Sequence, residues 1–442
     1  MEPPNKHTRS NEELTISHSF PDLSTLPEPV LVHILSFMDI KEAVQTCILS
    51  KPWRKLWTLI PSLNLVNFRF NGTDAAFVQF VTSMLYFRGA SKLDTFSLNW
   101  RASQHVADYD NCQIHVGVTT SWIYSVLCCK PLVISLELIK FDYMKLPDAL
   151  FTCASLEQLE LTVCSYSNAN TALGPKYVNL PNLKKLMLGA VTLNDPVMQG
   201  ILSGCPLLEE LSLSYCIVNF SEMKSDMLSR LTIKKCRGST LVEIFMPSLI
   251  SLHLKNHCMK VTKLSLKNTP SLVKVFVFYD SYHEKCFFDA EFEFFKCLTT
   301  VTDLEFYGSG VKNLLEKMIP NCPIFHNIKK LTFGQWGTNE KLDVLCRLLQ
   351  HTPNLEKLTI VDKKVECSRK AKGKGAKEKD ATSQIPFRCE QLKAIEVKYS
   401  DPSGVHELVD VFLRNTSCGE RLRIDYFPQK YKSWGETSDR LF

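Results

Sequence analysis

The stretch that decides the fold is LEELSLSYC, residues 208–216, which is followed by LSRLTIKKC, residues 228–236. Each stretch places an apolar residue at its first, fourth and sixth positions and a cysteine at its ninth. The fourth and sixth positions alternate with a period of two, which predicts a short strand with one buried face. One such unit cannot bury its apolar face alone, so the pattern predicts that several units stack side by side.

The same pattern recurs along most of the chain. Its copies begin at Leu156, Leu183, Leu208, Leu228, Leu249, Leu272, Ile328 and Leu355, weaker copies begin at Val133, Val301 and Leu392, and Leu93 begins a further candidate. Residues between the strands, such as Val197, Ile201 and Leu202, have a helix-like spacing and should form an outer layer. This organisation predicts a leucine-rich-repeat solenoid, with parallel strands on the concave face and helices or turns on the convex face.

The cysteines fit the same repeat. There are seventeen, an odd number, and no C-x-x-C pair occurs, which argues against a zinc ribbon or a redox motif. Cys164, Cys216 and Cys236 follow the last strand residue at the same spacing, and Cys205 and Cys322 each precede a proline before a strand. Recurrence at fixed repeat positions predicts packing rather than metal binding, so we expect no metal and no cofactor.

Side chains that flank the buried leucines should point onto the concave face. The expected central column comprises Glu137, Glu160, Met187, Ser212, Thr232, His253, Phe276, Glu305 and Thr332, flanked by Lys234, Lys255, Phe278 and Tyr307. Aromatic rings with charged neighbours on an exposed sheet often mark a binding surface. The candidate target-binding residues are therefore Met187, His253, Lys255, Phe276, Phe278 and Tyr307. The alternatives are an error in the strand register or coverage of the surface by the neighbouring segment 279–295.

Charge is concentrated in one segment. The chain has 442 residues, is 45% hydrophobic and carries a formal charge of +6, of which residues 363–380 supply +5. The remainder is nearly neutral, which argues against a nucleic-acid-binding body. The basic segment, rich in Gly and Lys, should be a disordered insertion, with nuclear import or an acidic partner as alternative roles.

The first nineteen residues lack the apolar centre of a signal peptide, and no apolar run is long enough to span a bilayer. We therefore expect a protein of the nucleus, the cytoplasm or both, with no membrane partner.

Residues 20–65 do not fit the repeat. We expect three short helices there: one capped by Ser24 or Thr25, a second over residues 40–49, and a third whose N-cap is Ser50. Pro52 would then occupy the first turn of the third helix, where a missing N–H costs nothing. About 45 residues bury too little apolar surface to be stable alone, so this segment must pack on the repeats or on a partner chain.

Two stretches of this segment resemble the F-box. They are LPEPVLVHILSFM, residues 26–38, and KEAVQTCILSKPWRKLW, residues 41–57. The second is similar to plant F-box proteins that carry leucine-rich repeats. Near the C-terminus, residues 387–424 resemble the FBD region of the same plant family. Pro29, Met38-Asp39-Ile40 and Pro52 depart from the usual F-box pattern, but none of them removes an apolar contact residue.

The resemblance implies an α/β fold in which a short N-terminal three-helix F-box precedes a leucine-rich-repeat solenoid. The expected domains are a disordered tail at 1–19, the F-box at 20–65, a linker or capping segment at 66–92, the repeats at 93–362, the basic disordered insertion at 363–384, an FBD-like region with the last repeat at 385–430 and a C-terminal tail at 431–442.

The resemblance also implies a function. F-box proteins dock on an SKP-type adaptor, and through it on a cullin scaffold, while the second domain holds a target protein for ubiquitination and degradation. The implied adaptor-binding residues are Leu26, Pro27, Val30, Leu31, Ile34, Leu35, Ile48, Leu49, Trp53 and Leu56. A chain of this class positions the target and performs no chemistry itself.

Other functions remain open. The sequence has no G-x-x-x-x-G-K-[ST], G-x-S-x-G or H-E-x-x-H motif, so an enzyme is disfavoured. Cys128-Cys129 could include a nucleophile, although packing at a repeat turn explains the pair more simply. Two further alternatives remain: a repeat scaffold that acts outside a ligase, and a small-molecule receptor.

Overall fold

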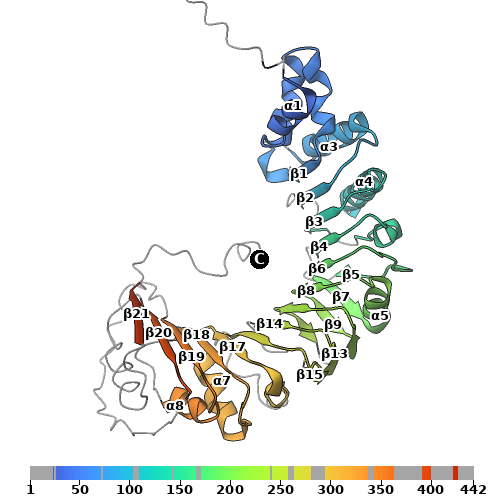
Figure 1. Ribbon diagram of the computed structural model, residues 1–442. Helices are drawn as coiled ribbons and strands as arrows, with labels where there is room; N and C mark the ends of the chain where they lie inside the picture. Colours follow the sequence, from blue (N-terminus) through green and yellow to red (C-terminus); the bar gives the residue numbers. More distant parts are fainter. Residues whose placement is uncertain are drawn as a thin grey trace, which may run out of the picture.

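A single curved sheet sets the shape of the molecule. The computed structural model describes residues 23, 26–70, 73–102, 109–141, 144–165, 171–238, 241–256, 263–279, 294–336, 343–362, 391–399 and 422–426. Within these ranges, fourteen parallel strands line the inner side of an arc, and the helices lie outside it (Figure 1). The predicted solenoid with a parallel, concave sheet is therefore confirmed.

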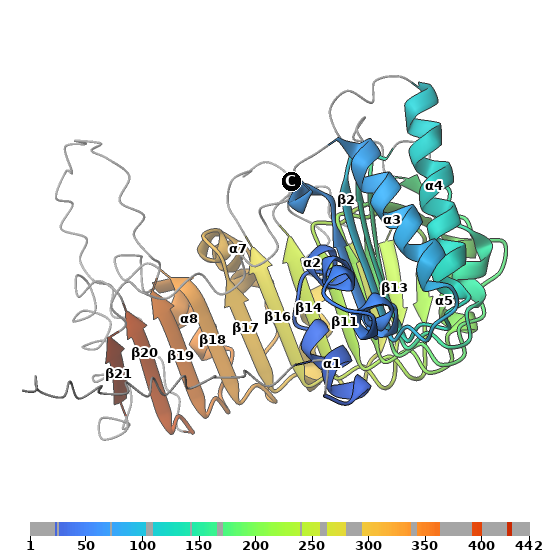
Figure 2. The same ribbon diagram turned by 90° about the horizontal axis from the view of Figure 1, so that it is seen from above.

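The strands follow one another along the sheet in sequence order, side by side (Figure 2). They are β1 (Ser62–Val66), β2 (Thr95–Arg101), β3 (Val133–Ile139), β4 (Gln158–Cys164), β6 (Lys185–Gly189), β8 (Glu210–Ser214), β11 (Arg230–Lys234), β14 (Ser251–Asn256), β16 (Lys274–Tyr279), β17 (Asp303–Tyr307), β18 (Lys330–Trp336), β19 (Lys357–Asp362), β20 (Ala394–Tyr399) and β21 (Leu422–Tyr426). This order buries the apolar face of each strand against its neighbours and the convex layer.

The register is set by the leucine pattern. Leu211 lies opposite Leu186 on one side and Leu231 on the other, and the same alignment continues through every strand pair of the main sheet. One predicted alignment is wrong by two residues: Ser135, rather than Glu137, lies opposite Glu160. In the segment VISLEL, Ile134, Leu136 and Leu138 are all apolar. The Leu-x-Leu pair of the strand could therefore be residues 134 and 136 or residues 136 and 138, and the sequence pattern could not distinguish the two registers.

The convex layer contains both helices and strands. Its helices are α3 (Asp74–Arg88), α4 (Tyr109–Leu127), α5 (Asp195–Gly204), α7 (Val311–Met318) and α8 (Asp343–Gln350), with 3-10 turns η5 (Asn67–Arg69), η6 (Asp148–Thr152), η7 (Leu298–Thr300) and η8 (Ile319–Asn321). Two small parallel sheets complete it: β5 (Thr171–Ala172), β7 (Val191–Asn194), β9 (Ile217–Asn219) and β12 (Arg237–Gly238) in one, and β10 (Glu222–Lys224), β13 (Leu241–Phe245) and β15 (Lys263–Asn268) in the other. The sequence analysis did not predict these strands. Strands β9, β10, β12, β13 and β15 lie in repeats of 20–23 residues, which are too short to include a helix, whereas β7 precedes α5 in a longer repeat.

The turn after each strand explains the recurring cysteines. Tyr215 and Lys235 have positive φ values of 56° and 51°, which turn the chain away from the sheet. The next residues are Cys216 and Cys236, both buried. Their thiols donate to the carbonyls of Leu188 and Leu213, one repeat earlier, at 3.4 Å. These two cysteines therefore form the predicted ladder, whereas Cys164 is half-buried and ends strand β4.

A second ladder lies at the entry to the strands. Asn182, Asn327 and Asn354 each precede the first apolar residue of a repeat. Their side-chain amides donate to the carbonyls of Ala154, Thr299 and His326, one repeat earlier, at 2.6–2.8 Å. These bonds satisfy backbone groups that the turns leave unpaired.

The sheet begins earlier than residue 93. Strand β1 begins inside the segment expected to be the F-box and ends one residue beyond it, and α3 occupies more than half of the segment expected to be a linker. The buried apolar residues form one hydrophobic cluster that runs from Leu31 to Val397. The front segment therefore packs on the repeats, as its size required. No helix in the described ranges is long and apolar enough to cross a membrane.

Candidate functional site

The front segment folds into two α-helices followed by three 3-10 turns. Helix α1 (Glu28–Leu35) begins after Pro27, and α2 (Ile40–Gln45) begins at Asp39, whose carboxylate accepts a hydrogen bond from the Lys41 N–H at 2.9 Å. The turns are η2 (Thr46–Ile48), η3 (Pro52–Arg54) and η4 (Leu56–Leu59). Ser24 and Thr25, the expected caps of the first helix, lie outside the described residues.

The expected third helix is not one α-helix. Pro52 begins a 3-10 turn whose N-cap is Lys51, rather than Ser50, and Lys55 with φ of −114° separates this turn from η4. The position of the proline at the start of a helical turn was predicted correctly. The continuous α-helix was wrong: Trp53, Leu56, Trp57 and Ile60 are all buried and have the spacing of one helical face, but the backbone divides into two 3-10 turns at Lys55.

The predicted adaptor-binding residues divide into two groups by exposure. Leu31, Leu35, Trp53 and Leu56 are buried in the chain's own core, and Leu26 is half-buried. Four others are exposed apolar side chains: Val30, Ile34, Ile48 and Leu49. Ile48 is 83% exposed and Leu49 is 65% exposed. Pro27 is exposed as well. Only the exposed group can contact a partner without unfolding. The buried group packs in the core beneath the helices and turns that carry the exposed side chains.

The structure adds two residues to the exposed group. Phe37 is 77% exposed and Met38 is 38% exposed, just after α1. The ring of Phe37 packs edge-on against His33, with 4.9 Å between ring centroids. We call Val30, Ile34, Phe37, Met38, Ile48 and Leu49 the F-box apolar face. Phe37 and Met38 both lie within the F-box-like stretch of the sequence, but their exposure depends on how α1 ends.

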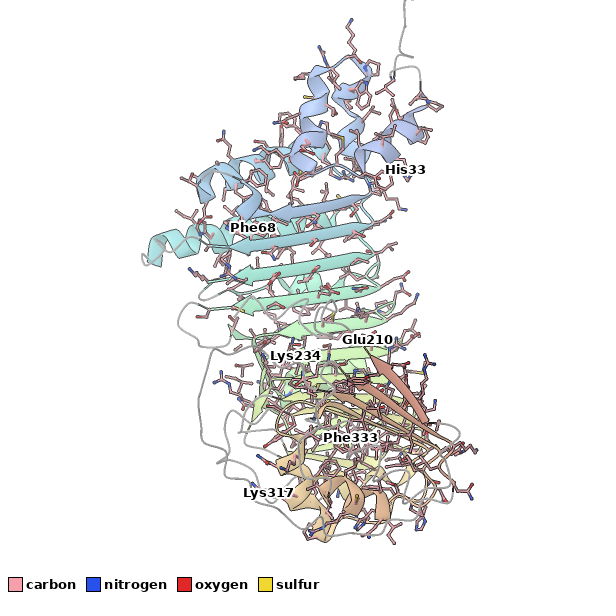
Figure 3. All side chains as sticks on the ribbon, turned by 90° about the vertical axis from the view of Figure 1, so that its left-hand side faces the viewer. His33, Phe68, Glu210, Lys234, Lys317 and Phe333 are labelled. Atoms are coloured by element: carbon pink, nitrogen blue, oxygen red, sulfur yellow. The ribbon has the colours of Figure 1, made fainter. Side chains whose placement is uncertain are left out.

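The concave sheet brings together five of the six predicted target-binding residues. His253, Lys255, Phe276, Phe278 and Tyr307 lie on the neighbouring strands β14, β16 and β17. Met187 lies on β6, separated from them by β8 and β11. Figure 3 views the molecule from the inner side of the arc and labels Glu210 and Lys234 on these two intervening strands.

The rings of this group stack across strands. The centroids of Phe276 and Tyr307 are 5.1 Å apart with an interplanar angle of 23°, and His253 lies 5.4 Å from Phe276. The Lys255 ammonium lies 5.5 Å from the centroid of the Phe276 ring. Gly334, on β18, allows the stack, because a Cβ there would overlap the Tyr307 ring. We call His253, Lys255, Phe276, Phe278 and Tyr307 the aromatic patch.

Charged neighbours shape the electrostatics of the patch. Lys274 forms an ion pair with Glu305 at 2.6 Å, and this hydrogen bond raises the pKa of Lys274. Burial, followed by repulsion from Lys255 and Lys274, lowers the pKa of His253. Burial, together with Glu305 and Asp303, raises the pKa of Tyr307. At neutral pH the patch therefore presents a neutral imidazole, a neutral phenol and a lysine.

The N-terminal strands carry a polar network that the sequence did not reveal. The Asn99 amide donates to the Glu137 carboxylate, and the Ser135 hydroxyl donates to Glu160 at 3.1 Å. Gln158 donates to the other Glu160 oxygen at 2.6 Å. Burial raises the pKa of Glu137. The predicted alignment placed Glu137, rather than Ser135, opposite Glu160, so the sequence analysis did not predict this network.

The described thiols and acids offer no metal site. Within the described residues, no group of three His, Cys, Asp or Glu side chains is arranged to hold a metal ion. Burial raises the pKa of the Cys205 and Cys322 thiols to about 12 and that of Cys164 to about 11. Cys129 is buried, and burial raises its pKa also. These thiols are protonated at neutral pH and are poor nucleophiles.

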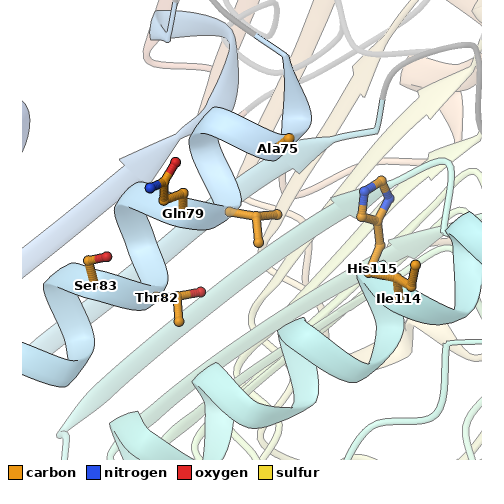
Figure 4. Close-up of a pocket in the computed structure, with 7 residues that line it drawn as sticks. Ala75, Gln79, Thr82, Ser83, Ile114 and His115 are labelled. Carbon is orange, nitrogen blue, oxygen red and sulfur yellow. The ribbon is translucent and has the colours of Figure 1, made fainter.

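A pocket of about 460 Å³ lies between α3 and α4 (Figure 4). Gln79, Thr82 and Ser83 line it from α3, and Ile114 and His115 line it from α4. The lining carries no carboxylate and no amine, and burial lowers the pKa of His115. Since a small ligand would find few polar anchors there, we assign this pocket no function.

Comparisons with known proteins agree with this architecture. Residues 23–64 match the family model of the F-box domain, and residues 129–284 match the model described as "FBD-associated F-box protein At5g56370, LRR repeats". The F-box/FBD/LRR-repeat protein At1g51370 of Arabidopsis thaliana is 28% identical over 429 residues, which cover 94% of this chain and 92% of that protein.

Two further relatives from the same organism support the same assignment. The F-box/FBD/LRR-repeat protein At1g78750 is 26% identical, and F-box/LRR-repeat protein 13 is 27% identical, and each alignment covers 76% of both chains. The F-box match coincides with the helices and turns that carry the apolar face, and the repeat match lies within the curved sheet. The chain is therefore an F-box/leucine-rich-repeat protein of the plant type.

Proposed function

We propose that this protein is the substrate-recognition subunit of an SCF-type ubiquitin ligase. Its F-box docks on an SKP-type adaptor and, through the adaptor, on a cullin scaffold, while the repeat array holds a target protein for ubiquitination. The chain acts by positioning the target and has no catalytic centre of its own. Such a ligase would operate in the nucleus, the cytoplasm or both.

The observation that carries the proposal is the F-box apolar face. Fully exposed isoleucine and phenylalanine side chains are unfavourable in water, and burying them against a partner releases about 1.5–3 kcal/mol each. Ile48, Leu49 and Phe37 are all more than half exposed, although the neighbouring Leu31, Leu35 and Trp53 are buried. With Val30, Ile34 and Met38, six exposed apolar residues lie within a 42-residue match to the F-box model, which favours a partner surface over ordinary surface variation.

Adaptor binding tests the proposal directly. The purified chain is mixed with an SKP-type adaptor, and the dissociation constant is measured by isothermal titration calorimetry. We expect the unmutated chain to form a complex with the adaptor. The double variant Ile48→Glu/Leu49→Glu should bind the adaptor with an affinity at least about 30-fold weaker. The secondary structure of the variant should be unchanged, because both side chains are exposed.

A matched pair of aromatic residues supplies the control. Tyr86 and Phe87 on α3 are 80% and 70% exposed and lie outside the F-box match. The double variant Tyr86→Glu/Phe87→Glu should bind the adaptor as the unmutated chain does. If the unmutated chain shows no adaptor binding, the ligase role is excluded, and a repeat scaffold outside a ligase becomes the favoured function.

A further inference from the structure

The asparagine ladder at the entry to the strands is interrupted in two neighbouring repeats. Asn182, Asn327 and Asn354 each precede the first buried apolar residue of a repeat and bond to the repeat before it. In the repeats of β8 and β11 the same position holds Leu207 and Met227, which are 43% and 51% exposed. An apolar side chain cannot replace the amide bond, so these two residues do not serve the ladder.

The position after the first buried apolar residue changes character in the next two repeats. Towards both ends of the array this position carries ion pairs between neighbouring repeats, at 2.7–3.5 Å: Lys184 with Glu157, Lys329 with Glu356, and Lys393 with Glu356. In the repeats of β14 and β16 it holds Ile250 and Val273 instead, which are 51% and 44% exposed. Polar contacts between repeats therefore give way to exposed apolar side chains in the middle of the array.

Backbone hydrogen bonds hold these four repeats side by side at the strand entries. The Ser229 N–H donates to the Glu209 carbonyl at 2.9 Å, the Ile250 N–H to the Ser229 carbonyl at 2.9 Å, and the Val273 N–H to the Ile250 carbonyl at 3.0 Å. We call Leu207, Met227, Ile250 and Val273 the apolar entry stripe. Strands about 4.8 Å apart place its outer two repeats about 14 Å from each other.

The same backbone bonds favour a helix over a strand as the partner of the stripe. The N–H groups of Ser229, Ile250 and Val273 are already bonded to neighbouring repeats, so a partner strand cannot pair with them. An α-helix satisfies its own backbone and binds through side chains alone. Since a helix rises 1.5 Å per residue, about ten residues span the stripe, with apolar side chains at i, i+3, i+7 and i+10.

Charge beside the stripe selects the flanks of such a helix. Glu209 and Asp226 are exposed and lie within two residues of Leu207 and Met227 in the sequence. The nearby Arg230 does not offset them, because it pairs with Glu210 at 3.4 Å. Lysine or arginine on the flanks of a helix would complement these carboxylates, whereas an anionic membrane surface would be repelled by them.

From these observations we propose that the apolar entry stripe binds an amphipathic helix of a partner protein, with lysine or arginine on its flanks. The stripe is separate from the F-box apolar face and from the aromatic patch, so the proposal does not depend on the ligase role. In Figure 3, Glu210 at the entry of β8 and His33 of α1 lie on the same side of the molecule. A helix on the stripe would therefore bind on the side of the array that carries α1.

Binding of designed peptides to the full-length chain tests the proposal. The probe is a fluorescein-labelled helix-forming peptide with leucine along one face, lysine on both flanks and alanine elsewhere. One control peptide has the same composition in an order that leaves no apolar face, and the other has glutamate in place of every lysine. Fluorescence anisotropy should give at least about fivefold tighter binding of the probe than of either control peptide.

Matched variants of the chain locate the site. Met227→Glu/Ile250→Glu should weaken binding of the probe at least about tenfold. Leu132→Glu/Ile324→Glu makes the same chemical change at two exposed apolar residues outside the stripe and should leave binding unchanged. Both double variants should keep the Tm of the unmutated chain, because all four side chains are exposed.

Reversing the charge beside the stripe tests the flanks of the helix. Glu209→Lys/Asp226→Lys should weaken the probe about threefold or more at low salt, and the effect should shrink as salt rises, because both carboxylates are exposed. Charge reversal without effect at low salt would contradict the basic character proposed for the partner helix.

Several results would overturn the proposal. They are no binding of the probe, equal binding of the peptide without an apolar face, and equal loss of binding from both double variants. Two competing occupants are tested with the same Met227→Glu/Ile250→Glu variant. If this variant abolishes sedimentation of the chain with phosphatidylserine vesicles, the stripe contacts a membrane. If it disperses a dimer seen by sedimentation velocity, the stripe contacts a second copy of the chain.

Discussion

Gly334 shows how a single missing side chain builds the aromatic patch. A Cβ at this position would overlap the ring of Tyr307, which stacks on Phe276. Gly308 is constrained differently, by its φ of 111° and by the backbone of Tyr279. The two glycines therefore serve different purposes, one for a side-chain stack and one for a turn.

Substituting the two glycines should separate these roles. Gly334→Ala should cost about 1 kcal/mol of stability, because the half-exposed Tyr307 ring can rotate away, but it should break the ring stack. Gly308→Ala should cost about 3 kcal/mol or more, because backbone cannot move aside and the φ is unfavourable for alanine. Urea unfolding measures the free energy of unfolding, and near-UV circular dichroism measures whether the Tyr307 ring keeps its stacked environment. A Gly334→Ala chain that is as unstable as Gly308→Ala would contradict this assignment.

His253 makes the stability of the array depend on pH. Burial lowers its pKa below the ordinary value of 6.5 in the folded chain. As the pH falls through 6.5 towards this lowered pKa, the unfolded chain binds a proton that the folded chain does not, so stability decreases. Below the folded pKa the loss is complete.

The variant His253→Gln should therefore lose less stability on acidification. We expect its Tm to fall less than that of the unmutated chain between pH 7.5 and pH 5, measured by circular dichroism at constant ionic strength. His115 shifts in the same direction and remains in both chains, so it does not affect the difference. Parallel Tm curves for the two chains would show that the imidazole of His253 titrates alike in the folded and unfolded states.

At the scale of elements, η4 is the joint between the F-box and the array. It contacts α1 and α2 on one side and α3 on the other, and it contributes the buried Leu56 and Trp57. Trp57 thus faces the interior that both parts share. Both tryptophans are buried, Trp53 on η3 and Trp57 on η4.

Trp57→Ala should destabilise this joint. Removing a buried tryptophan side chain costs about 3–5 kcal/mol. The F-box should loosen and adaptor affinity should fall, while the far-UV circular dichroism of the array persists. The comparison with Ile48→Glu/Leu49→Glu is informative, because that variant should lose adaptor binding at an unchanged Tm. An unchanged Tm for Trp57→Ala would place the tryptophan outside the core.

At the scale of the whole molecule, strand pairing makes the sheet independent of the connections between its strands. Strands β19 and β20 pair in full register, although residues 363–390 between them lie outside the described part of the chain. The basic insertion, the N-terminal tail and the C-terminal tail expected from the sequence also lie outside it. Of the FBD-like region, residues 391–399 and 422–426 are described, and they include β20 and β21, the last two strands of the sheet.

Deleting residues 369–380 should leave the Tm within about 2 °C, because shortening a long connection changes the closure entropy only slightly. The remaining connection is still long enough to join two neighbouring strands. Differential scanning calorimetry of the deleted and complete chains measures the change. A drop of more than about 5 °C would mean that the segment packs against the array.

The sequence alone determined the repeat architecture and the order of its parts. The Leu-x-x-Leu-x-Leu pattern depends on contacts between neighbouring repeats, and these are local enough to leave a clear period. The pattern also predicted that His253, Phe276 and Tyr307 would share a face, because strand residues two apart point the same way. The F-box-like stretches in turn predicted a partner surface near the N-terminus.

Only the tertiary structure decided which of those residues face outward and which lie together. Leu31 and Ile34 are both apolar residues of the same short helix, yet one is buried and the other is exposed. Their difference comes from the packing of η4 against α1, a contact between segments that the local pattern does not encode. The register of β3 and the convex strands have the same origin, since each is decided by pairing with neighbouring repeats.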